Sequence, residues 1–141
     1  MKNFSVRFLI FMCVFCFSSF SFAESSQSYA VVKVLKSIFD KPDALLSVDA
    51  VAISDSGQYS LASWAQKGKG GRALLRKNNG DWEIVLCGGK DLLNAEALIR
   101  AGIPKSESYG IVEKLKASEN NLTQSQRKLF DSFGKIQQVS H

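Results

Sequence analysis

Four runs of apolar and β-branched residues in the middle of the chain are each bounded by Gly, Asn, Asp or Lys. This pattern is typical of strands. We expect strands over residues 45–53, 58–66, 72–77 and 82–87, with residues 67–71 as a flexible connection. The Asn79-Gly80 pair favours a tight hairpin turn, because both residues tolerate positive φ angles.

The two-residue period of a strand predicts which side chains share a face. In the last strand, Trp82, Ile84 and Leu86 are expected on one face, and Glu83, Val85 and Cys87 on the other. Because Val85 is apolar, we expect its face to be covered near Cys87. In the preceding strand, Arg72 and Arg76 share a face with Leu74.

The apolar period becomes helical on either side of the strands. Residues 29–39 repeat apolar positions at helical spacing. Pro42 ends this helix, because it pushes the preceding residue out of the α region. After the strands, Asp91 or Asn94 is expected to cap a short helix.

Two further helices are expected near the end of the chain. One begins at Ser106, and its inward side chains are predicted to be Tyr109, Val112 and Leu115. Thr123 and Gln126 form a capping box for the last helix, whose apolar stripe is Leu129, Phe130 and Phe133. Strands followed by helices predict an α+β fold: an N-terminal helix, a four-stranded antiparallel meander, then two to three short helices.

The first residues are typical of a secretory signal peptide. Lys2 and Arg7 precede an apolar core, and small residues lead to Ala23. We expect cleavage after Ala23, so residues 1–23 are removed and residues 24–141 form one α+β domain in the periplasm. The alternative is an uncleaved anchor, which needs about 20 apolar residues.

The net charge of the chain adds little to these predictions. The formal net charge of +5 falls to +3 when the predicted signal peptide leaves with its two basic residues. The basic residues cluster at Lys67, Lys69, Arg72, Arg76 and Lys77. A solvated hairpin face is the simplest interpretation, and an anionic partner or a membrane surface is the alternative. No interleaved aromatic residues indicate a nucleic-acid platform.

Few residues could carry out catalysis. Cys87 is the only cysteine beyond the predicted signal peptide, so it is buried, paired with another chain, or functional. The only histidine is His141, the last residue. A Cys–His pair needs both side chains held within hydrogen-bond reach, which a chain end provides poorly. We therefore expect no enzyme.

Metal ligands are also scarce. A structural zinc site uses about four nitrogen or sulfur ligands, and copper(I) prefers thiolate or thioether sulfur. Met1 and Met12 both lie in the predicted signal peptide. Cys87 is the remaining candidate metal ligand, and two chains could bridge a copper ion through it.

Planar guanidinium groups suit carboxylates, so Arg72 and Arg76 beside Trp64 could bind an acidic partner. The chain also carries a long motif, whose members are Trp64, Gly70-Gly71-Arg72, Arg76, Gly80-Asp81-Trp82, Val85-Leu86-Cys87-Gly88, Ala101-Gly102-Ile103-Pro104, Phe130 and Phe133. This motif resembles that of the copper uptake system-associated proteins, which are small and exported. The resemblance implies a periplasmic accessory role in copper uptake or homeostasis and a copper-handling partner, but no reaction.

Three functional hypotheses follow. The preferred one is a non-enzymatic interaction module that acts through Trp64, Arg72 and Arg76. The second is a dimeric copper(I) carrier that uses Cys87. The third is an α+β domain with a small-molecule pocket between sheet and helices.

Overall fold

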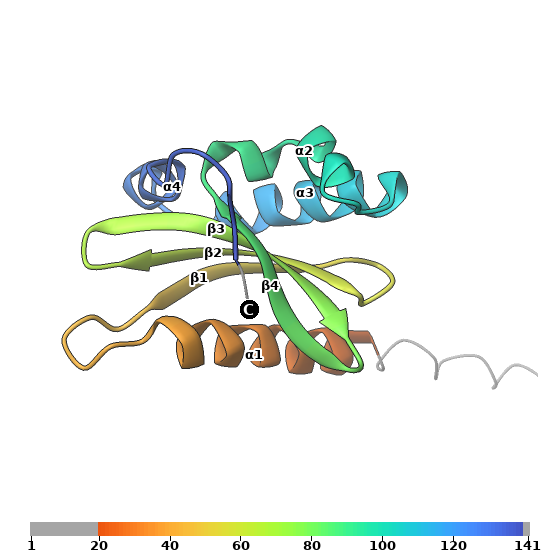
Figure 1. Cartoon of the computed structure of the whole chain (residues 1–141), viewed down its shortest axis with the longest axis horizontal. Coiled ribbons are helices and arrows are strands. Elements are labelled where there is room, and N and C mark those ends of the chain that lie inside the picture. The colour runs from red at the N-terminus through yellow and green to blue at the C-terminus, as the bar shows by residue number, and fades with distance from the viewer. Residues whose placement is uncertain (1–19, 140–141) are drawn as a thin grey trace, which may run out of the picture.

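The computed structural model describes residues 20–139 of the chain. Its sheet is formed by β1 (Ser47–Ile53), β2 (Tyr59–Gln66), β3 (Lys69–Asn78), β4 (Asp81–Gly88) and β5 (Gln137–Gln138). Its helices are α1 (Phe20–Phe39), η1 (Lys90–Leu93), α2 (Ala95–Arg100), α3 (Lys105–Glu119) and α4 (Gln124–Asp131). Helix α1 covers one face of the sheet, and the later helices cover the other (Figure 1).

The sheet has the order β1-β2-β3-β4-β5, and every neighbouring pair is antiparallel. This confirms the α+β fold, with five strands where we expected four. Strand β5 is two exposed glutamines that pair with Leu86 and Cys87. It was missed because so short a polar segment carries no apolar alternation.

The connection between β2 and β3 is shorter than expected. Only Lys67 and Gly68 form the turn, with φ angles of 51° and 75°. Residues 69–71 are already paired with β2, so the predicted flexible connection was wrong. Two positive φ angles match the right-handed twist of a two-residue hairpin.

A β-bulge changes the predicted faces of β4. Leu74 pairs with Leu86, whereas the next residue, Leu75, pairs with Ile84. Val85 is thus an extra residue in β4, and such a residue interrupts the two-residue alternation. Cys87 therefore packs on the α1 side of the sheet with Trp82 and Ile84, and Leu86 packs on the opposite side. Trp82 and Ile84 share a face as predicted, but the prediction was wrong in placing Leu86 with them and Val85 with Cys87.

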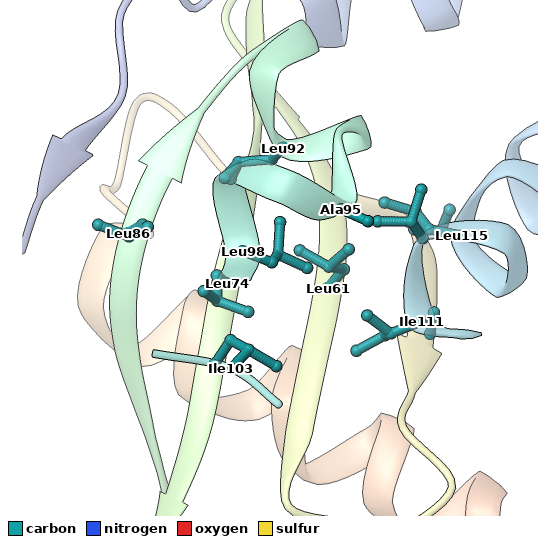
Figure 2. Close-up of a cluster of buried hydrophobic side chains, with 12 residues drawn as sticks. Leu61, Leu74, Leu86, Leu92, Ala95, Leu98, Ile103, Ile111 and Leu115 are labelled. Carbon is teal, nitrogen blue, oxygen red and sulfur yellow. The ribbon is translucent and has the colours of Figure 1, made fainter. Parts of the chain in front are cut away.

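Apolar side chains fill both faces of the sheet. On the α1 side, Val31 and Leu35 pack against Ala62 and Leu75 of the central strands. On the other side, the cluster comprises Leu61, Leu74, Leu86, Leu92, Ala95, Leu98, Ile103, Ile111 and Leu115, among others (Figure 2). Two buried faces explain why consecutive residues in β2 and β3 are buried.

The predicted caps are confirmed. Asn94 Oδ1 accepts a hydrogen bond from the Glu96 amide at 3.0 Å, and Thr123 with Gln126 forms the capping box of α4. Tyr109 is a correction, because it is 47 % exposed and Ser108, Ile111, Val112 and Leu115 line the buried face of α3.

Helix α1 extends further toward the N-terminus than expected. We predicted residues 29–39, and the helix begins at Phe20. Side chains 23–26 are exposed and carry no apolar period. Within residues 20–139, no helix is both long enough and apolar enough to cross a bilayer. Most of the predicted signal peptide lies outside the described residues.

Candidate functional site

Two glycine pairs lie side by side at one end of the sheet, because Arg72, which follows Gly70-Gly71, pairs with Gly88. A Cβ atom at Gly70 would lie 2.8 Å from the Leu129 carbonyl oxygen and 2.9 Å from that of Trp64. These distances are below normal contact and involve backbone atoms, so the last turn of α4 approaches the sheet too closely for any side chain.

The same close approach occurs at the end of β4. A Cβ atom at Gly89 would lie 2.9 Å from the Asp131 carbonyl oxygen, and one at Gly71 would lie 2.9 Å from Cδ2 of Phe133. The glycine pairs are therefore the platform on which the C-terminal segment packs. The glycines of the sequence motif on which the family resemblance rests therefore have a structural role in this chain.

Arg72 projects from this platform into the helix layer and is 1 % exposed. Its Nε and Nη2 donate to Oε1 and Oε2 of Glu119 at 2.7 and 2.9 Å. Its Nη1 donates to Oδ1 of Asp131 at 2.7 Å. The guanidinium carbon also lies 5.8 Å from the centre of the Phe130 ring. The guanidinium thus joins β3 to both α3 and α4.

Electrostatics keep the Arg72 guanidinium charged. Burial alone would lower the pKa of Arg72, but hydrogen bonds and charge from Glu119 and Asp131 raise it above its ordinary value. Ser63 Oγ also donates to Oε1 of Glu119. Glu119 is 3 % exposed, whereas Asp131 is 41 % exposed. The cluster therefore reaches solvent only at Asp131.

Sequence reasoning did not identify the partners of Arg72. Glu119 follows Leu115 by four residues, so it continues the buried stripe of α3. An acidic residue on a predicted apolar stripe needs a buried partner. The sequence thus indicated that Glu119 needs a buried partner, although it did not indicate which basic residue that partner is.

Trp64 lies on the other face of the sheet. Its ring stacks on Phe39 with centroids 6.4 Å apart and meets Phe133 edge to face at 5.8 Å. Its Nε1 is buried and has no hydrogen-bond partner among residues 20–139. The structure therefore does not bring Trp64, Arg72 and Arg76 together as one surface, and Arg72 is not accessible to a partner.

The predicted basic cluster is also divided. Lys67 and Lys69 lie at one end of β3, and Arg76 and Lys77 at the other. Lys67 Nζ pairs with Asp43 at 3.0 Å, and Lys77 Nζ lies 5.2 Å from the Trp82 ring centre. Arg76 is exposed and lines a hollow of about 210 Å³ together with Glu83, Ile84, Val85, Gln138 and Val139.

Cys87, the candidate metal ligand, is 5 % exposed and not disulfide-bonded. Burial raises the pKa of its thiol to about 11. The thiolate, which is the metal-binding form, is therefore disfavoured near neutral pH. Within the described part of the chain, no three His, Cys, Asp or Glu side chains gather as a metal site. Met1, Met12 and His141 lie outside it.

The space between the sheet and α2–α3 is the place for the hypothesised small-molecule pocket. Side chains fill it, since Leu61, Leu74, Leu98 and Leu115 are all 0 % exposed (Figure 2). This packing does not favour that hypothesis.

No family model, curated protein or solved structure matches the chain. The resemblance to the copper uptake system-associated proteins therefore stays a prediction from the sequence.

Proposed function

We propose that this protein is a periplasmic accessory protein of copper uptake or homeostasis and acts as a non-enzymatic interaction module. The copper role is supported by the sequence resemblance alone. The interaction module is supported by the burial of Arg72, whose Nε, Nη1 and Nη2 all donate to carboxylates of the chain itself. The Cys87 thiol is buried as well. We therefore take both of these residues of the motif to contribute to packing. What remains for function is the surface.

Arg76 is the residue that we propose for partner contact. It is exposed, and it makes no ion pair with any residue in the described range 20–139. Val85 and Val139 lie in the same hollow and give it an apolar wall. A guanidinium beside apolar side chains suits a partner carboxylate, because it binds both oxygens in one plane.

The test is cellular copper content under copper-limited and copper-replete growth. Deleting the gene should change copper content, and the full chain should restore it. A chain starting at Glu24, which lacks the predicted export signal, should not restore it. Arg76→Glu should also fail at equal protein abundance, because it reverses the contact charge.

Lys69→Glu is the matched control for Arg76→Glu, since Lys69 is exposed at the far end of the same strand. It should restore copper content fully. Copper content that is unaffected by the deletion would refute the copper role. Full restoration by Arg76→Glu would refute the proposed role of Arg76 in partner contact, but it would not refute the copper role.

A further inference from the structure

The chain after α4 crosses the end of the sheet and descends along β4 (Figure 1). We call residues 132–139 the C-terminal strap. We infer that this strap opens as a local unit, is held closed by the Asp131–Arg72 ion pair, and controls access to the Cys87 thiol. This inference does not depend on the proposed copper role.

The strap is held more weakly than the rest of the sheet. None of its residues is fully buried. Its regular pairing is limited to the two residues of β5 and one further bond from the Val139 amide to the Val85 carbonyl at 3.2 Å. Segments with few buried contacts and short pairing open at lower free energy than the core.

A turn and an ion pair lie together at the start of the strap. Gly134 has a φ angle of 89°, a conformation that glycine adopts without strain. Asp131, the last residue of α4, is fixed by Arg72, while the neighbouring Phe130 is 0 % exposed. The Asp131–Arg72 ion pair therefore holds the residue from which the strap begins, and the Gly134 turn lies within the strap.

Opening would uncover the neighbourhood of Cys87. The Cys87 backbone pairs with Gln137 of the strap. Phe133 and Val139 pack against the buried cluster that contains Cys87. Removing the strap takes away both the neighbouring strand and these two side chains, so the thiol becomes accessible while β1–β4 stay folded.

The experiment measures the rate of alkylation of Cys87 at pH 8 in the protein purified after export. Peptide mass spectrometry resolves this thiol from Cys13 and Cys16. Asp131→Ala should raise the rate about tenfold, since it removes a charge-assisted hydrogen bond from the closed state. Asp55→Ala is the matched control, because it breaks the exposed Lys114–Asp55 ion pair and should leave the rate unchanged.

Equal rates in wild type and a folded Asp131→Ala variant would overturn the inference. If that variant does not fold, hydrogen exchange of the wild type decides. The Val139 amide should exchange faster than the paired amides of β2 and β3, with little dependence on low urea concentrations. If the amides of Val139, β2 and β3 all exchanged at the rate of global unfolding, the inference would also be overturned.

Discussion

Arg72 and Glu119 form a bidentate ion pair in which two guanidinium nitrogens each donate to a separate carboxylate oxygen, at 2.7 and 2.9 Å. The residues are 47 positions apart, and their side chains are 1 % and 3 % exposed. This pair joins the sheet to the helix layer. Both charged groups are buried away from water, so each needs the other as its ion-pair partner.

Glu119→Ala should lower the free energy of unfolding by about 3–5 kcal/mol, because it leaves a buried guanidinium short of a partner. Urea denaturation measures the loss. Glu113→Ala is the control: Glu113 pairs with Lys116 at 3.4 Å on the exposed face of the same helix, and its loss should cost less than about 1 kcal/mol. Similar losses in the two variants would contradict a structural role for the Arg72–Glu119 pair.

Gly70→Ala should destabilise the protein by about 1–3 kcal/mol, because the new methyl group meets the Leu129 and Trp64 carbonyl oxygens. Gly110→Ala is the opposite case: it lies inside α3, and no atom approaches its Cβ position within 4 Å. It should stabilise by about 0.5–1 kcal/mol through helix propensity. Thermal unfolding of both variants tests the glycine platform, and a neutral Gly70→Ala would contradict it.

Cys87 should make stability fall at alkaline pH. Burial raises the pKa of the folded thiol from its ordinary value of 9.0 to about 11. The neutral thiol is thus favoured by folding, so its contribution is complete below pH 9 and is lost as the pH rises toward 11. The difference corresponds to about 3 kcal/mol.

The measurement is urea denaturation at several pH values, comparing wild type with Cys87→Ala. Lysines and tyrosines titrate in both proteins, so only the difference between them reports the thiol. A difference in stability that stays constant between pH 8 and pH 11 would contradict the buried thiol.

Export should yield a protein that begins at Glu24. Ala23 to Ser26 are exposed, and Val31 is the first fully buried residue among the side chains of α1 that the structure describes, from residue 23 on. Cleavage after Ala23 therefore removes no described buried side chain. Intact mass of the exported protein checks the start. Ala23→Arg should block processing, because signal peptidase sites require a small residue there. Ser26→Arg, three residues later and equally exposed, should not.

Local elements were well predicted from the sequence because local chemistry determines them. Asn79-Gly80 forms the expected turn with φ angles of 51° and 84°, and the Thr123–Gln126 capping box opens α4 as expected. Each feature involves residues at most three positions apart. Their backbone preferences and hydrogen bonds hold whatever the rest of the chain does.

The candidate site was predicted less well. Arg72 was expected at the surface because its strand period places it beside Arg76, and that period says nothing of what covers the face. Glu119 and Asp131, 47 and 59 positions away, turn it into a buried residue. Cys87 was assigned to the wrong face because the extra residue, Val85, shifts the alternation, and a bulge depends on the pairing of two strands.

The sequence by itself determined the helices, the four long strands, their order and most of their turns and caps, since these follow from side-chain periodicity and backbone preferences within a few residues. Only the tertiary structure decided that the glycine pairs support α4, that Arg72 is an internal ion-pair partner and that the strap pairs beside Cys87. Those outcomes depend on the desolvation and close contact of segments far apart in the chain, which local preferences do not encode.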